Sequence, residues 1–158
     1  MKTTICFRLN GEEMEIAVEP NLTLLDMLRE RLHITSPKKS CDEGDCGACT
    51  VLLNGKAVNS CLVLALSVNG QEVMTLEGLG NAQNLHPLQK HFYEMGGSQC
   101  GYCTPGMIMA AKAFLDENPN PTEEEVKEGL SGNLCRCTGY IKPIKATLAA
   151  AKEINEGK

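Results

Sequence analysis

The sequence predicts an α+β protein, with a small mixed sheet in the first half of the chain and four helices in the second. Apolar residues alternate along short segments before residue 77 and recur at helical spacing after residue 84. Eight of the nine cysteines fall into two groups of four, one group in each half of the 158-residue chain, and Cys6 stands outside both. A two-part fold with one cysteine group in each part is therefore expected.

The chain begins with a predicted hairpin. Residues 3–9 and 12–19 each place their apolar side chains on one strand face, and Pro20 ends the second segment. Asn10-Gly11 lies between them, a dipeptide that tight hairpins favour because both turn residues must adopt positive φ.

One helix and three more strands complete the first part. Four leucines at helical spacing predict an amphipathic helix of about ten residues; they are Leu24, Leu25, Leu28 and Leu32. A second Asn-Gly at 54–55 predicts a hairpin between residues 50–53 and 56–58. Residues 72–76 are expected to form the last short strand, which gives a small mixed sheet with a helix packed on it.

The second part is predicted to be helical after a linker at 77–84. Helices are expected at 85–95, from Thr104 as N-cap to the "NPNP" at 118–121, from Thr122 to about "SGN" at 131–133, and at 143–154. Pro105 suits the first helical position, and Thr122 with Glu125 forms a capping box. Short loops between four helices favour an antiparallel bundle.

Several functional classes are disfavoured by the composition. The net charge is −5, which argues against nucleic-acid binding. No apolar run approaches the roughly 18 residues of a membrane span, and residues 1–10 lack the apolar core of a signal sequence. A cytoplasmic location is therefore expected, where metal ligation explains the cysteines better than disulfides do.

The first cysteine group has the spacing C-x4-C-x2-C with a fourth cysteine downstream, which is typical of plant-type [2Fe–2S] ferredoxins. Its members are Cys41, Cys46, Cys49 and Cys61. Gly44 and Gly47 permit the φ angles that a tight three-ligand loop requires, and the acidic residues 42, 43 and 45 are expected to point outward. A structural zinc site with four cysteine ligands is the alternative.

The second group joins a C-x2-C at the start of a predicted helix to a C-x-C after another helix. Its members are Cys100, Cys103, Cys135 and Cys137. Spacing alone leaves three possibilities open: a second cluster, a zinc site and a redox-active C-x-x-C. A ferredoxin-type first site favours an electron carrier in the second.

Three stretches resemble a known family: "CDEGDCGACTV" from Cys41, "SQCGYCTPGMIMA" from Ser98 and "SGNLCRCTGY" from Ser131. In the same order, they are similar to motifs of the iron–sulfur subunit of molybdenum hydroxylases, the xanthine dehydrogenase and aldehyde oxidoreductase family. The resemblance covers nearly the whole chain. It implies a ferredoxin-like β-grasp domain over residues 1–78 and a four-helix-bundle domain over 79–158, each holding one [2Fe–2S] cluster.

The resemblance also implies roles for single residues. The cluster nearer the flavin would be held by Cys41, Cys46, Cys49 and Cys61, and the cluster beside the molybdopterin by Cys100, Cys103, Cys135 and Cys137. Gln99 stands where the family has a glutamine that contacts the pterin, and Cys137 stands at the ligand on the through-bond route to it. Family members usually carry glycine before the first cysteine, where this chain has Ser40.

The partners implied by the resemblance are a molybdopterin-binding large subunit and an FAD-binding medium subunit, assembled as a dimer of heterotrimers. Electrons would pass from the molybdopterin through the helical-domain cluster and the N-terminal cluster to FAD. This chain would supply no catalytic base or nucleophile, and it contains no dinucleotide-binding glycine motif, P-loop or nucleophile elbow. The expected substrate is a purine or N-heterocycle of the xanthine or nicotinate type.

Two other classes of protein are also consistent with cysteine-rich sites. A free-standing two-cluster ferredoxin would act alone, without molybdenum or flavin. A zinc-stabilised interaction module would hold zinc in place of iron. The whole-chain resemblance favours the electron-transfer subunit over both.

Overall fold

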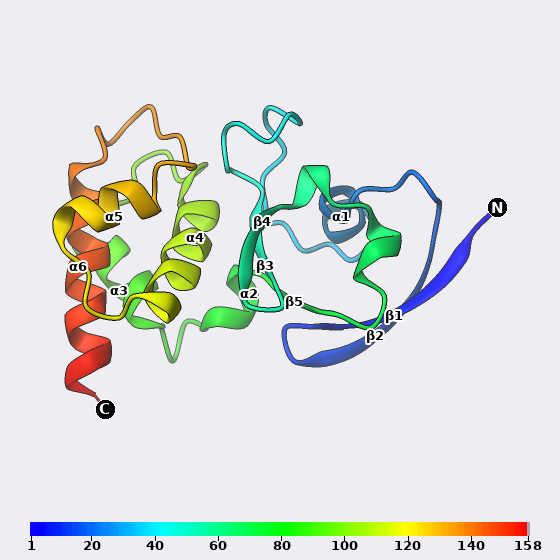
Figure 1. Cartoon of the computed structure of the whole chain (residues 1–158), viewed down its shortest axis with the longest axis horizontal. Coiled ribbons are helices and arrows are strands. Elements are labelled where there is room, and N and C mark those ends of the chain that lie inside the picture. Colours follow the sequence, from blue (N-terminus) through cyan, green and yellow to red (C-terminus); the bar gives the residue numbers. More distant parts are fainter. Residues whose placement is uncertain (158) are drawn as a thin grey trace.

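A mixed five-stranded sheet forms the first part of the molecule in the computed structural model, which describes residues 1–157 (Figure 1). The strands are β1 (Thr3–Leu9), β2 (Glu12–Val18), β3 (Thr50–Leu53), β4 (Lys56–Asn59) and β5 (Glu72–Met74), in the order β2-β1-β5-β3-β4. β1 and β5 pair in parallel, whereas β2 pairs with β1 and β3 with both β4 and β5 in antiparallel fashion. The predicted mixed sheet is confirmed.

Both predicted hairpins form around their Asn-Gly turns. The turn residues all have positive φ, from +50° at Asn54 to +87° at Gly11. The registers follow the alternation in the sequence, so that Ile5, Phe7 and Leu9 are buried on one face of β1. Burial of this face places the apolar side chains of the hairpin in the first core.

The predicted helix at 24–32 differs in form. It begins as α1 (Leu24–Asp26), where the Thr23 hydroxyl accepts the backbone N–H of Asp26, and continues as the π-helical turn η1 (Met27–Arg31). The leucine periodicity predicts the buried face but cannot distinguish a wider turn from an α-helical one. Two short 3-10 turns, η2 (Ser60–Leu62) and η3 (Ala65–Val68), are too short to leave a periodic signal.

Helices form the second part, with small corrections to their predicted ends. They are α2 (Leu76–Leu79), α3 (Pro87–Glu94), α4 (Thr104–Glu117), α5 (Glu123–Gly129) and α6 (Ile141–Glu156). The capping box of α5 forms as predicted between Thr122 and Glu125. Thr104, predicted as an N-cap, is instead the first residue of α4, and its hydroxyl donates to Ser98 Oγ. α2 includes the first residues of the linker predicted at 77–84. It begins at Leu76, inside the strand predicted at 72–76, and β5 ends earlier, at Met74.

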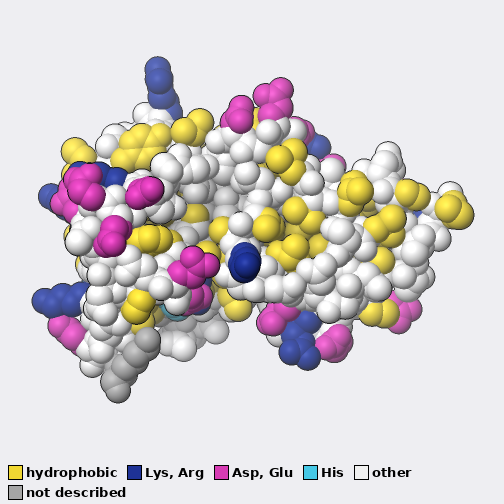
Figure 2. Space-filling view, viewed as in Figure 1, with side chains coloured by type: hydrophobic (Ala, Val, Ile, Leu, Met, Phe, Trp, Pro, Cys, Tyr) yellow, Lys and Arg dark blue, Asp and Glu magenta, His cyan; other side chains and the backbone are white. Residues whose placement is uncertain are grey.

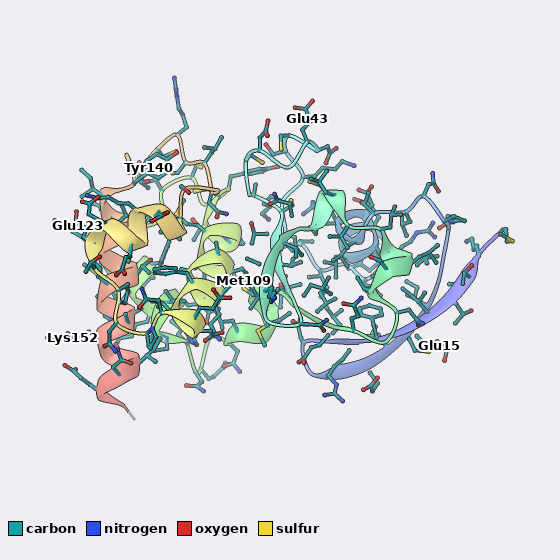
Figure 3. All side chains as sticks on the ribbon, viewed as in Figure 1. Glu15, Glu43, Met109, Glu123, Tyr140 and Lys152 are labelled. Carbon is teal, nitrogen blue, oxygen red and sulfur yellow. The ribbon has the colours of Figure 1, made fainter. Side chains whose placement is uncertain are left out.

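Each part has its own apolar core. In the first, side chains from β1, β3, β5, α1 and η1 pack together, with Phe7, Met27 and Val51 almost fully buried. In the second, α3, α4, α5 and α6 surround Leu88, Phe92 and others. The parts meet where α4 packs on β3 and β4, and the buried Met109 of α4 lies at this junction (Figure 3).

On the surface, acidic and basic side chains are interspersed on the described part of the face shown in Figure 2, without a continuous basic stripe. Among the helices of residues 1–157, none has the length and apolar character needed to cross a bilayer.

Candidate iron–sulfur centres

The loop from Cys41 to Cys49 is tightly wound, as the glycine positions predict. Asp42, Gly44 and Gly47 have φ angles of +57°, +85° and +69°. A Cβ on Gly44 would meet only the end of the exposed, flexible Leu62 side chain, 2.5 Å from its Cδ1, so the positive φ is the stronger reason for glycine there. Ser40 is not among the residues with positive φ, and its side chain is therefore compatible with the backbone there.

The acidic residues of this loop point outward as predicted, since Asp42, Glu43 and Asp45 are all exposed. Glu43 extends from the tip of the loop in Figure 3. The backbone N–H groups turn inward instead: those of Glu43 and Cys46 donate to Cys41 Sγ over 3.4 and 3.5 Å. The N–H bond from Glu43, followed by that from Cys46, lowers the pKa of the Cys41 thiol to about 7. The loop therefore stabilises negative charge on sulfur.

The other two sulfurs of the first group lie deeper. Cys49 and Cys61 are buried, with their Sγ atoms 3.5 Å apart. Burial, followed by the neighbouring Cys49 thiol, raises the pKa of Cys61 to about 12, and Cys41 adds a smaller contribution in the same direction. The thiols of Cys41, Cys49 and Cys61 are thus close enough to influence one another, and Cys46 acts on Cys41.

The second group brings together the loop that ends at Cys103, the N-cap of α4, and the loop before α6. Burial, followed by contact with the Cys135 thiol, raises the pKa of Cys103 to about 12. Contact with the Cys100 thiol is the largest influence on the pKa of Cys137 and raises it. The Cys103 and Cys135 thiols are therefore neighbours, as are those of Cys100 and Cys137, and Cys100 also acts on Cys103.

Hydrogen bonds to sulfur also occur at the second group. The Thr138 hydroxyl donates to Cys135 Sγ over 3.1 Å. Burial raises the pKa of Cys135, but this bond, together with backbone N–H groups of Thr138 and Cys137, outweighs burial and lowers it.

The thiols have the chemistry and, at one pair, the spacing of shared metal coordination. Two thiolates on one tetrahedral metal with bonds of about 2.3 Å lie about 3.8 Å apart, close to the 3.5 Å between the sulfurs of Cys49 and Cys61. A [2Fe–2S] cluster takes four cysteine ligands, two on each iron, and each group supplies four thiols. The residues present therefore fit one [2Fe–2S] cluster in each group.

The two cysteine groups lie against each other across the junction of the two parts. The backbone N–H of Leu134 donates to the carbonyl of Cys46 over 2.9 Å. The buried Asn133 side chain donates to the Gly47 carbonyl over 2.9 Å and to Thr50 Oγ1 over 3.2 Å. Figure 1 shows the first cysteine loop and the loop before α6 on the same, upper side of the molecule.

This junction is the part of the site that sequence reasoning missed. In the sequence, the "SGN" at 131–133 marks the end of a helix and the start of a family motif, but it does not indicate that Asn133 contacts the first cysteine loop. Gly106 could have indicated this contact from the sequence, because glycine inside a helix often marks close packing. Its Cβ would lie 2.4 Å from the Gly47 carbonyl oxygen, so α4 approaches the first cysteine loop through this position.

The remaining predicted site residues lie at the surface of the second group. Gln99, Cys100 and Cys137 are exposed, as is Arg136 between the two final cysteines. Cys6 is also exposed but belongs to β1, outside both groups. The second group thus opens to the outside of this chain, whereas Cys49 and Cys61 of the first group are enclosed.

Comparison with known proteins identifies the two parts. A family model described as "2Fe-2S iron-sulfur cluster binding domain" matches residues 7–78, and one described as "[2Fe-2S] binding domain" matches residues 75–148. The small FeS subunit of nicotinate dehydrogenase from Eubacterium barkeri is 55% identical over 96% of both chains. A probable xanthine dehydrogenase subunit from Bacillus subtilis is 44% identical, over 95% of this chain and 86% of that one.

A solved structure agrees over the same length. One chain of quinoline 2-oxidoreductase from Pseudomonas putida 86 superposes with a TM-score of 0.94 at 42% identity, covering 99% of this chain and 98% of that chain. The match extends across both parts and therefore includes both cysteine groups and the junction between them. The protein belongs to the iron–sulfur subunits of the molybdenum hydroxylase family, the family of xanthine dehydrogenase and aldehyde oxidoreductase.

Proposed function

We propose that this chain is the electron-transfer subunit of a molybdenum hydroxylase that acts on an N-heteroaromatic substrate of the nicotinate or xanthine type. The observation that carries the proposal is that a chain with two adjacent four-cysteine groups is similar over its whole length to a small FeS subunit. The substrate would be oxidised on another subunit. Because the nicotinate dehydrogenase relative has the higher identity of the two named above, nicotinate is favoured over xanthine.

Each cysteine group would hold one [2Fe–2S] cluster, which supplies a one-electron carrier when bound. The ligands proposed are Cys41, Cys46, Cys49 and Cys61 for the first and Cys100, Cys103, Cys135 and Cys137 for the second. The protein's own contribution is to donate hydrogen bonds to sulfur and to exclude water, which together adjust the potential. The separate apolar cores support a ferredoxin-like β-grasp domain over 1–78 and a four-helix-bundle domain over 79–158.

The chain itself offers a short route between the two groups. Cys46 is a ligand candidate of the first group, and its carbonyl accepts the N–H of Leu134, which is bonded directly to Cys135 of the second. One hydrogen bond of 2.9 Å therefore links the two ligand sets through otherwise covalent bonds. The Asn133 side chain, with its bonds to Gly47 and Thr50, holds this contact in place.

The exposure of the two sites supports this assignment of the partner subunits. Gln99, Cys100 and Cys137 face outward, which suits contact with a molybdopterin-binding large subunit. The first group would face an FAD-binding medium subunit, where the neighbouring Leu62 is 61% exposed. Exposure of the second site alone would equally suit a diffusing ferredoxin, but similarity to a small FeS subunit favours a docked one. A cytoplasmic dimer of heterotrimers completes the proposal.

The test is to purify the tagged chain gently from its own host, with the chains that accompany it, and to measure its metals. We expect about four irons per chain, since each cluster has two, together with molybdenum, FAD and a large chain. Addition of nicotinate should then reduce both [2Fe–2S] signals in electron paramagnetic resonance (EPR) spectra. Four irons without molybdenum or partners would support a free ferredoxin, and zinc in place of iron an interaction module. Reduction by xanthine but not nicotinate would correct the substrate alone.

A further inference from the structure

We propose that the Thr138 hydroxyl raises the reduction potential of the second cluster by donating a hydrogen bond to Cys135 Sγ. This inference rests on the proposed function, because it requires Cys135 to be a cluster ligand. It makes Thr138 a positioning and tuning residue for electron transfer, without contact with the substrate.

The geometry allows the Thr138 hydroxyl hydrogen to point at the sulfur of Cys135. Thr138 Oγ1 lies 3.1 Å from Cys135 Sγ and accepts the backbone N–H of Tyr140 over 3.2 Å. Since a hydroxyl has one hydrogen to donate, and its oxygen already serves Tyr140 as acceptor, the hydrogen is free to point at the sulfur. Both Thr138 and Cys135 are half-buried, which limits competition from water.

A second hydrogen bond holds the same turn closed. The Tyr140 hydroxyl accepts the backbone N–H of Cys135 over 3.0 Å. Tyr140 itself has a φ of +68° at the start of α6, where Figure 3 shows it beside the last cysteine loop. Thr138 Oγ1 is thus held between Cys135 Sγ and the backbone N–H of Tyr140, and these two hydrogen bonds keep the donor in position.

Backbone N–H groups reach sulfur in both cysteine groups, but the second group also has a side-chain donor. At Cys41, the hydrogen bonds come from the backbone N–H groups of Glu43 and Cys46, which remain when side chains are substituted. Among the hydrogen bonds of residues 1–157, Thr138 provides the one hydroxyl that reaches a cysteine sulfur. A single substitution can therefore perturb one site and leave the other unchanged.

The sign of the effect follows from charge. Reduction adds one negative charge to the cluster and its thiolates, and a hydrogen-bond donor at sulfur stabilises the more negative state. Removing the hydroxyl should therefore make the second cluster harder to reduce, and keeping it should preserve the potential.

The experiment compares Thr138→Val, which loses the hydroxyl at nearly constant shape, with Thr138→Ser, which keeps it. The matched control is Thr104→Val, because Thr104 also adjoins a proposed ligand but donates to Ser98 Oγ and not to sulfur. Each variant is purified as the whole complex and titrated electrochemically, with the two [2Fe–2S] signals followed by EPR at low temperature.

For Thr138→Val we expect the reduced-to-oxidised ratio of one cluster to fall about tenfold at the wild-type midpoint, which equals about 59 mV for one electron. In Thr138→Val, the ratio of the other cluster should stay within about twofold of wild type, or about 18 mV on the same scale. In Thr138→Ser and Thr104→Val, the ratios of both clusters should stay within the same limit. Unchanged potentials in Thr138→Val would overturn the proposal, and so would equal shifts in Thr138→Val and Thr138→Ser.

Two further outcomes are distinguishable. If Thr138→Val retains less iron, the smaller Thr138→Ala removes the same hydroxyl and is judged by the same criteria. If the wild-type complex itself lacks two [2Fe–2S] signals, the proposed function fails. If both signals are present and neither shifts when the hydroxyl is removed, only the role of Thr138 is refuted.

Discussion

Substitution of Gly47 by alanine should destabilise the protein by damaging the contact between its two cysteine loops. Gly47 lies between Cys46 and Cys49 in a buried position with a φ of +69°. A Cβ there would lie 2.3 Å from the carbonyl oxygen of Gly132 and 2.6 Å from Asn133 Nδ2. The nearest obstacle is backbone, and the adjacent Leu134–Cys46 hydrogen bond restricts its movement.

The expected loss has two components. An L-residue in the left-handed region costs about 1–2 kcal/mol, and overpacking a close contact costs about 1–3 kcal/mol more. The sum is about 2–5 kcal/mol, which is a large part of the stability of an ordinary domain. Relief of the overlap would also separate Leu134 from Cys46, so a lower iron content in both cysteine groups should accompany the lower stability.

Gly55→Ala is the matched control for this prediction. Gly55 has a φ of +80°, yet a Cβ on it would have no atom within 4 Å. Gly55→Ala should therefore lose only the folding stability that the left-handed backbone costs, about 1–2 kcal/mol. In urea, with a slope of about 2 kcal/mol per molar, the midpoints of the two variants should differ by about 1 M. Equal midpoints and equal iron contents would refute the assignment of Gly47 to a close interdomain contact.

Three further predictions use other contacts. Asn133→Ala should cost about 2 kcal/mol, because it removes two buried hydrogen bonds across the junction, at Gly47 and Thr50, each worth about 1 kcal/mol, and iron analysis should show losses at both groups. Thr122→Ala should remove the α5 cap at a cost of about 1 kcal/mol in urea unfolding without loss of iron. Burial raises the pKa of Glu77, but hydrogen bonds from Ser36 and Thr75 outweigh the effect of burial, so the pKa is lowered overall. The contribution of Glu77 to folding stability is thus present above the ordinary carboxyl pKa of about 4.3, and it is lost as pH falls through the pKa of Glu77 in the folded protein. Glu77→Gln should therefore flatten the acid side of a stability–pH profile.

Local signals in the sequence were sufficient for most of the fold. Both Asn-Gly hairpins, the alternation of β1 and the capping box of α5 depend on residues only a few positions apart, and each is confirmed. The form of the helix at 24–32 was not predicted, because α-helical and π-helical turns bury almost the same leucines. The parallel pairing of β1 with β5 joins strands that are far apart in the chain, for which the sequence offers no local signal.

The composition of the candidate sites was also predictable, but their mutual placement was not. Cysteine spacing and the nearby glycines indicate a tight three-ligand loop, and the outward acidic residues are confirmed. Ligand assignments stay predictions, since pairing of thiols supports them without the metal. The contact of Asn133 with Gly47 crosses 86 positions, and the need for glycine at 47 and 106 arises from that approach as much as from the loop itself.

The junction explains why both cysteine groups are carried by one chain. α4 begins at the second group and packs on β3, which directly follows Cys49 of the first, so the same two elements fix the separation of the groups. Gly47 and Gly106 allow this approach because neither carries a side chain, and the Leu134–Cys46 hydrogen bond closes it. A flexible linker would leave the distance between two carriers variable, whereas this rigid contact holds it constant. The electron-transfer role therefore depends on residues that bind no metal, and substitutions at the junction should slow transfer between the groups even where every cysteine is retained.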